Sequence, residues 1–249
     1  MKPSRNPKRR PLSGAAPLLA FGAHPDDIEF GCGGILAAES RAGRKTHMIV
    51  CSRGESASNG TPARRTAESK KAAGFLGAKL EFVELDGDAH LHVCTAHAIK
   101  LAAILRTHRP GVVLAPTLTE NQHPDHPRLG QLVREAARLA RYGGVAELRH
   151  LDPHAIGQLF FYAISPDGEC PGTTPVLVDV SDWKVMNAWI KAMRSHTSQL
   201  GSRKYVELQL ARAQVHGLRA GVEHAIALYP NESIILDRLS RLGKGARRF

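Results

Sequence analysis

Short apolar runs alternate along this chain with longer segments in which apolar residues recur at helical spacing. The runs have the length of buried strands, and a repeated order of strand and helix predicts a mostly parallel sheet with right-handed crossovers. The sequence therefore predicts a Rossmann-like, doubly wound α/β fold in a single domain. We expect strands at 18–21, 46–51, 80–85, 112–115, 158–164 and 175–180, and helices starting with 35–38 and then at 62–77, 95–108, 128–141, 183–196, 203–217 and 232–242.

Two of the expected helices carry boundary signals. Thr61-Pro62 places an N-cap residue before a proline at the first helical position, and Ser181-Asp182 caps the helix at 183–196. An apolar stripe on the second helix predicts a face that packs in the core or against another subunit. The stripe consists of Trp183, Met186, Trp189, Ile190 and Met193.

Two polar turns each follow an apolar run and precede an expected helix. The first contains His24-Pro25-Asp26-Asp27 and the second contains His123-Pro124-Asp125-His126. Ligands of an open α/β sheet bind at the carboxyl ends of the strands, which is where both turns are expected. The two turns therefore meet if their strands share one sheet.

The residues of these turns are of the types that bind a metal ion. His24 and Asp27 are three residues apart, as are His123 and His126, so each pair can reach a common point. A catalytic zinc site has three protein ligands and one open position. Two histidines and one carboxylate from this set of four satisfy that number and leave one histidine over. The alternative is two ordinary turns, because Pro and Asp are common turn residues.

The first turn, read as Ala23 to Gly34, resembles the first signature of the LmbE-like (PIG-L) family of zinc-dependent de-N-acetylases, and the second turn resembles their second signature. The similarity extends from about Leu18 to Gln199. Further segments resemble the branch that deacetylates N-acetylglucosaminyl-malate in bacillithiol synthesis. These are Ser58 to Thr61, Arg65, Glu68, Ala72-Ala73, Leu76-Gly77 and His196 to Gln199.

The resemblance implies a role for each residue of the turns. His24, Asp27 and His126 would hold Zn²⁺, with Fe²⁺ as the other candidate metal. Asp26 would be the base that deprotonates the attacking water, and His123 would act on the oxyanion side.

Outside the turns, Arg65 is the candidate for substrate binding, because its guanidinium suits a carboxylate or sugar oxygens. The alternative for Arg65 is an exposed charge on a helix. Asn121, where relatives often have an acidic residue, and the stretch 222–228 depart from the family pattern. These departures concern the substrate and leave the metal set intact.

The charge of the chain is concentrated at its ends. The net charge is +11, with five basic and no acidic residues in 1–10 and again in 238–249, so the body is close to neutral. We expect a basic arm at 1–16, a deacetylase domain at 17–237 and a basic tail at 238–249. With 5% aromatic residues there is no pattern for base stacking, which argues against nucleic acid as a partner.

Cysteine usage and hydropathy indicate the compartment. The four cysteines are scattered and form no C-x-x-C pair, which is typical of reduced thiols in a cytoplasmic protein. The apolar run before the first turn is too short for a signal peptide, and no run is long enough to span a membrane.

The sequence predicts a hydrolase that uses one metal ion to remove an N-acetyl group from an amino-sugar conjugate. The alternatives are a catalytically inactive protein of the same fold that binds a sugar or nucleic acid, and a two-metal phosphoesterase. Assembly into a homo-oligomer stays open.

Overall fold

The computed structural model describes residues 14–121, 123–201 and 204–238. A seven-stranded sheet forms its centre, in the order β3-β2-β1-β4-β5-β7-β6. Its strands are β1 (Leu18–Gly22), β2 (Thr46–Val50), β3 (Lys79–Phe82), β4 (Val112–Pro116), β5 (Gln158–Tyr162), β6 (Val176–Asp179) and β7 (Ala225–Pro230). The helices are α1 (Asp27–Arg41), α2 (Pro62–Leu76), α3 (Thr95–His108), α4 (Asp125–Arg141), α5 (Trp183–Arg194) and α6 (Tyr205–Ala220), with short 3₁₀ turns at Ala146–Leu148 and Pro166–Gly168.

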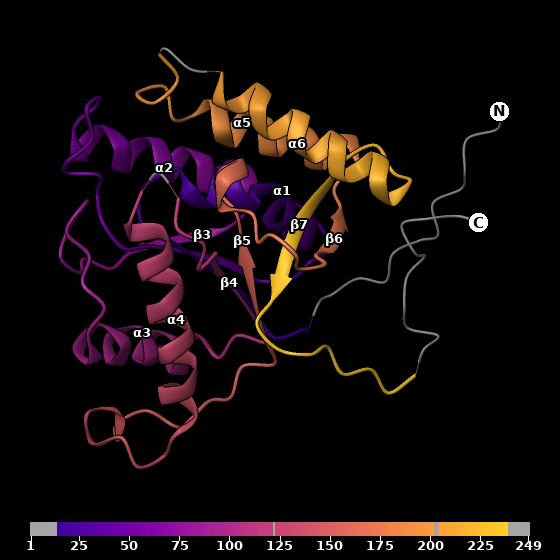
Figure 1. The fold of residues 1–249 in the computed structure, drawn as a ribbon. Helices are drawn as coiled ribbons and strands as arrows, with labels where there is room; N and C mark the ends of the chain where they lie inside the picture. Colours follow the sequence, from indigo (N-terminus) through magenta and orange to yellow (C-terminus); the bar gives the residue numbers. More distant parts are fainter. Residues whose placement is uncertain (1–13, 122, 202–203, 239–249) are drawn as a thin grey trace.

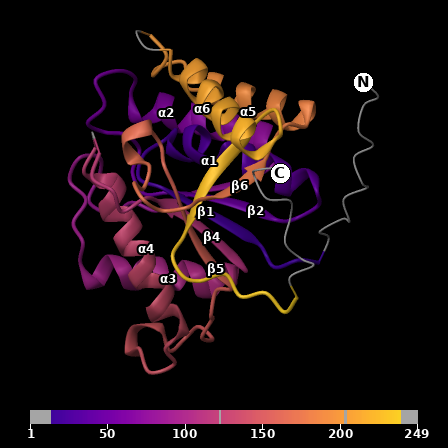
Figure 2. The same ribbon diagram turned by 45° about the vertical axis from the view of Figure 1, so that its right-hand side comes forward.

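The sheet lies between two layers of helices (Figure 1). Helices α1, α2, α5 and α6 cover one face, and α3 and α4 cover the other. The same layers can be followed after a 45° turn (Figure 2). Strands β3, β2, β1, β4 and β5 run parallel in this order, whereas β7 is antiparallel to both of its neighbours. The predicted doubly wound, mostly parallel α/β fold is confirmed.

Helix α2 follows its predicted boundary signals closely. The Thr61 side chain accepts a hydrogen bond from Arg64 N, Pro62 occupies the first helical turn, and Gly77 ends the helix with a φ of 70°. Asp182 caps α5 by accepting from Lys184 N and Val185 N.

Helix α1 begins at Asp27, earlier than the expected start at residue 35, and so contains Gly31, Gly33 and Gly34. These glycines are tolerated within the helix because the neighbouring structure lies so close. A Cβ on Gly31 would lie 2.2 Å from the Tyr162 ring, and one on Gly33 would lie 2.9 Å from Trp189. Tight packing therefore outweighs the low helix propensity of glycine here.

Other expectations were wrong in part. Strand β7 was not predicted, and residues 232–238, expected to begin a helix, are not helical; the rest of that expected helix lies outside the described residues. On α5, Trp189 and Met193 are buried, but Trp183 is 69% exposed and does not belong to the core stripe. The expected arm and tail lie outside the described residues except for 14–16 and 238.

Two further points concern the cysteines and the length and polarity of the helices. All four cysteines are free thiols. In the described part of the chain, every helix is too short or too polar to cross a lipid bilayer.

Candidate metal centre

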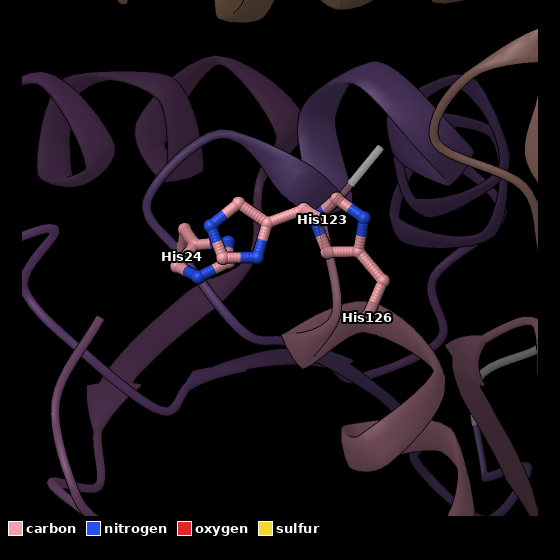
Figure 3. Close-up of side chains that lie close together, drawn as sticks. All are labelled: His24, His123 and His126. Atoms are coloured by element: carbon pink, nitrogen blue, oxygen red, sulfur yellow. The ribbon is translucent and has the colours of Figure 1, made fainter. Parts of the chain in front are cut away.

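The two polar turns meet at the carboxyl ends of neighbouring strands. His24 lies between β1 and α1 and Asp27 begins α1; His123 lies between β4 and α4 and His126 stands in the first turn of α4; and β1 pairs with β4. The three histidine rings converge on one point (Figure 3). Their ligand nitrogens all lie within 4.8 Å of one another.

Asp27 lies between two of these histidines and is held by the backbone of its own turn. Its Oδ2 accepts hydrogen bonds from Ala23 N at 2.8 Å and His24 N at 3.0 Å. Its oxygens lie 3.6 Å from His24 Nδ1 and 3.2 Å from His126 Nε2. Burial disfavours its charge, but His126 and His24 outweigh burial and hold the pKa of Asp27 well below its usual value.

Hydrogen bonds on the far side of each ring determine which nitrogen is free for a metal ion. His24 Nε2 faces Asp88 Oδ1 at 3.2 Å and Asp125 Oδ2 at 3.3 Å, so it is assigned the proton. His126 Nδ1 lies 3.0 Å from Asn121 Oδ1 and is assigned the proton for the same reason. The lone pairs that remain, on His24 Nδ1 and His126 Nε2, are those that face Asp27.

His123 has a different environment from the other two histidines. Its Nδ1 accepts a hydrogen bond from Asp125 N at 3.3 Å, so its proton is assigned to Nε2, which lies 3.5 Å from Asp88 Oδ1. The His123 side chain is 32% exposed, against 6% for His24 and His126. His123 is therefore the most exposed of the three histidines, and its Nε2–H faces the Asp88 carboxylate.

Carboxylates surround His24 and favour positive charge at this point. Burial alone would lower the pKa of His24, but Asp27, Asp125 and Asp88 together raise it well above its usual value. A second possible ligand group combines His24 and His123 with the carboxylates of Asp88 and Asp125. One ligand atom of each of these four residues lies within 4.8 Å of the other three. These features fit a buried site for a divalent cation, for which the side chains that lie close enough together are His24, His123 and His126, or His24 and His123 with Asp88 and Asp125. The predicted donor set of His24, Asp27 and His126 stays a prediction, in which Asp88 and Asp125 would be hydrogen-bond partners of the histidines.

Asp26 stands beside this donor set in a strained conformation. It is the N-cap residue of α1 with a φ of 112°, a region that residues other than glycine rarely adopt, and its side chain makes no capping hydrogen bond. Its carboxylate is 19% exposed. Burial, opposed mainly by Arg65, raises the pKa of Asp26 to about 6.

Arg65 is buried, so the alternative of an exposed helix charge is wrong. Its Nη2 donates to Pro25 O at 2.7 Å and to Asp26 Oδ2 at 3.3 Å, and its Nη1 lies 3.8 Å from Asp88 Oδ2. It connects α2 to the two carboxylates on either side of it. Its role in substrate binding stays a prediction.

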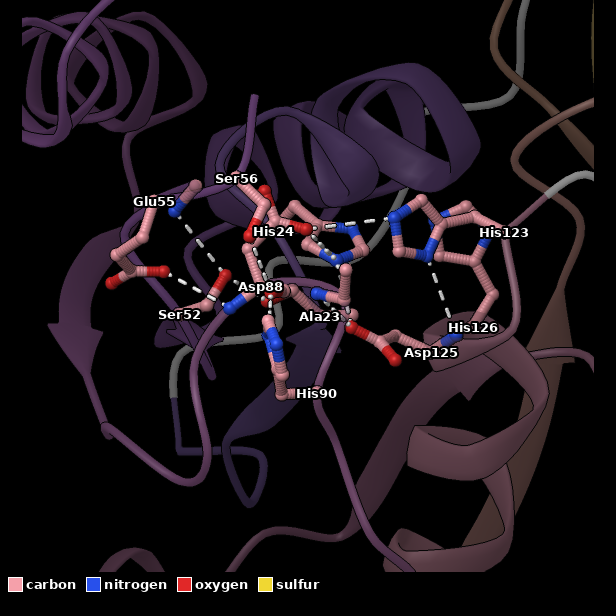
Figure 4. Close-up of polar contacts among 12 residues, drawn as sticks. Ala23, His24, Ser52, Glu55, Ser56, Asp88, His90, His123, Asp125 and His126 are labelled. Carbon is pink, nitrogen blue, oxygen red and sulfur yellow. Dashed lines mark hydrogen bonds and ion pairs between the residues drawn. The ribbon is translucent and has the colours of Figure 1, made fainter. Parts of the chain in front are cut away.

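Asp88 was missed at the sequence level. It lies in an Asp-Gly-Asp segment that is typical of a turn, yet its carboxylate contacts His24 and His123 (Figure 4). The same carboxylate also lies 3.8 Å from Arg65 Nη1. Asp125 connects the loop of Asp88 to His24, because its Oδ2 accepts a hydrogen bond from Ala89 N at 2.8 Å and lies 3.3 Å from His24 Nε2. A polar residue soon after a strand was the one signal that could have indicated Asp88.

Comparison with known proteins agrees with the fold and shows the family. A family model described as GlcNAc-PI de-N-acetylase (PIG-L) matches residues 19–137. The diacetylchitobiose deacetylase of Thermococcus kodakarensis is 30% identical over 202 residues, which cover 76% of this chain and 72% of the relative. The chain belongs to the PIG-L family of deacetylases.

Two further relatives extend the comparison. The conserved protein TT1542 of Thermus thermophilus superposes with a TM-score of 0.79 at 31% identity, covering 90% of this chain and 99% of that one. The 4-oxalmesaconate hydratase of Pseudomonas putida is 28% identical over 70% of this chain and 72% of its own. Of the three relatives, the one from Thermococcus kodakarensis is named a deacetylase and the one from Pseudomonas putida a hydratase. The comparisons therefore support the family and not the bacillithiol branch.

Proposed function

We propose that this protein is a metal-dependent N-deacetylase that removes the acetyl group from an amino-sugar conjugate. The observation that supports the proposal is the close approach of His24, Asp27 and His126, with Asp26, whose carboxylate is held by Arg65, next to Asp27 in the chain, and with the His123 ring 4.2 Å from that of His24. A donor set with a separate acid–base pair is what hydrolysis of an unactivated amide requires.

The donor set suits Zn²⁺, and its nitrogen and oxygen atoms would also accept Fe²⁺. Zinc bound there would lower the pKa of a water molecule and polarise the carbonyl of the substrate. The chain itself supplies orientation, since Asp125 fixes His24 and Asn121 fixes His126. Without these partners each ring could turn its protonated nitrogen toward the metal position.

Asp26 carries out both proton transfers, and His123 stabilises the charge that develops on the carbonyl oxygen. Asp26 takes a proton from the attacking water and gives it to the amine nitrogen as that nitrogen leaves. His123 Nε2–H donates to the carbonyl oxygen as negative charge develops on it. Arg65 holds the Asp26 carboxylate in place by a hydrogen bond of 3.3 Å, and its proposed contact with the substrate would use the Nη1 side near Asp88.

The proposal is tested by metal analysis together with acetate release. The purified protein is analysed for bound metal and incubated with N-acetylglucosamine, diacetylchitobiose and N-acetylglucosaminyl-malate. We expect one metal ion per chain and acetate release that a chelator abolishes. Bound metal without acetate from any substrate would favour a binding protein, and two metal ions per chain would favour phosphoester hydrolysis.

A second candidate function is hydration of a carbon–carbon double bond, which the similarity to the Pseudomonas putida hydratase supports. Both reactions need a water molecule deprotonated by Asp26, but only the hydratase must protonate a carbon atom. Incubation with unsaturated di- and tricarboxylic acids separates the two. Loss of ultraviolet absorbance without acetate release from the amide panel would favour the hydratase.

A further inference from the structure

The segment His196–Gln199, which follows α5, contacts the two helices that carry and support Asp26. On one side His196 Nε2 lies 2.9 Å from Glu29 Oε1, and both side chains are fully buried. Glu29 stands in the first turn of α1, three residues after Asp26. Trp189 Nε1 of α5 also donates to Glu29 O at 2.7 Å. The first turn of α1 is therefore bound both at the side chain and at the backbone of Glu29.

On its other side the same segment binds one carboxylate of α2. Glu68 Oε1 accepts hydrogen bonds from Thr197 Oγ1 at 2.8 Å and Ser198 N at 2.9 Å. Glu68 Oε2 accepts from Ser198 Oγ at 2.6 Å. Hydrogen bonds to an ionised carboxylate are stronger than neutral ones, and this carboxylate is buried. Helix α2 is therefore fixed to the segment at Glu68.

Glu68 lies one helical turn after Arg65, the residue that reaches Asp26. Because residues three apart lie on the same side of a helix, a shift of Glu68 would move Arg65 with it. Arg65 in turn holds Asp26 Oδ2 and Pro25 O. The strained backbone of Asp26 and its side chain thus depend on contacts from both helices, and 196–199 connects those helices.

We propose that His196–Gln199 and Glu68 form a clamp that holds Asp26 in its reactive position, with Glu68 and Ser198 as positioning residues. The inference rests on the proposed function, in which Asp26 moves the proton. None of the clamp residues contacts the donor set of the metal site directly. The clamp therefore acts on the rate of the chemical step and not on metal binding.

The test compares Glu68→Ala, Glu68→Gln and Ser198→Ala with the wild-type protein in the acetate-release assay. We expect kcat to fall about 10- to 100-fold in Glu68→Ala, with KM and metal content within twofold of wild type. Glu68→Gln keeps one acceptor oxygen and retains more activity than Glu68→Ala. The matched control is Glu39→Gln, which breaks the ion pair with Arg44 at the other end of α1 and leaves kcat unchanged.

Hydrogen exchange of the same variants tests the clamp without using activity. In Glu68→Ala the amides of residues 27–34 should exchange faster than in the wild type, while those of α3 stay unchanged. If the wild type releases acetate and the variants match it in kcat and exchange, the clamp is wrong. A parallel loss of metal would also overturn it. If the wild type releases no acetate at all, the proposed function fails, and unchanged exchange at 27–34 is then the result that rejects the clamp.

Discussion

Replacement of Asp125 by Asn tests how the site holds its first histidine. The Asp125 side chain is buried, and its Oδ2 faces His24 Nε2 at 3.3 Å while accepting from Ala89 N at 2.8 Å. Asn has the same shape and can still accept from Ala89 through its oxygen. The change therefore removes one of the two carboxylates that favour a proton on His24 Nε2, leaves the other, Asp88, and keeps the fold of the loop.

The expected effect is a loss of metal affinity. Changing the hydrogen-bond partner of a metal-binding histidine weakens affinity about 10- to 100-fold in proteins of known chemistry. At about 1.4 kcal/mol for each factor of ten, this is about 1.4 to 2.8 kcal/mol of binding free energy. The lower end of this range is expected here, because the Asp125 carboxylate is buried and little screened by water, but Asp88 remains 3.2 Å from His24 Nε2.

The assay is competition for zinc against a fluorescent chelator, with circular dichroism to show that the variant is folded. Arg128→Gln is the matched control, because it removes the more exposed partner of Asp125, at 3.4 Å, and should change the zinc Kd less than twofold. A zinc Kd within twofold of wild type in Asp125→Asn would refute the reasoning. His24 would then bind through its other nitrogen or not at all.

Three further predictions concern other parts of the chain. Asp26→Asn should retain the metal and lose activity by about 10²- to 10⁴-fold, because it removes the proton acceptor only; loss of metal would exchange the roles of Asp26 and Asp27. Arg106→Met should lower the free energy of unfolding in urea by about 3–5 kcal/mol, because the buried guanidinium donates to five main-chain carbonyls at 2.6–3.5 Å; a loss below about 1 kcal/mol would contradict this. The pKa of Glu169 is held below its usual value by a hydrogen bond from His216 and by Arg212, which together outweigh burial. The Glu169 carboxylate therefore stabilises the fold at pH values above its unfolded pKa, and this stabilisation is lost as the pH falls through its folded pKa. Glu169→Gln should therefore lower Tm at pH 7 by more than it does at about pH 4, and an equal decrease at both would contradict the prediction.

The sequence predicted the parts of the fold whose signals are local. Helix α2 carries its own cap, proline and terminal glycine, and each polar turn lies between a strand and the helix that follows it in the chain. The meeting of His24 with His126 required only that β1 and β4 be neighbours in a parallel sheet. These features need no knowledge of distant contacts.

The missed parts depend on distant contacts. Strand β7 is an apolar run whose direction is determined by its pairing with β5 and β6, and its own residues do not encode that pairing. Helix α1 includes Gly31 because Tyr162, far along the chain, lies against it. Asp88 joins the site because its loop reaches from the edge strand β3 to His24, a path that no local pattern specifies.

The left-handed backbone at residue 26 has a consequence for protein engineering. An L-residue in such a conformation costs about 1–3 kcal/mol, which glycine would not incur. Directed evolution that rewards heat resistance alone would therefore tend to replace Asp26, the residue proposed as the base. Laboratory selection should therefore measure activity in every round, because under the proposed function the most heat-resistant variants would otherwise be inactive.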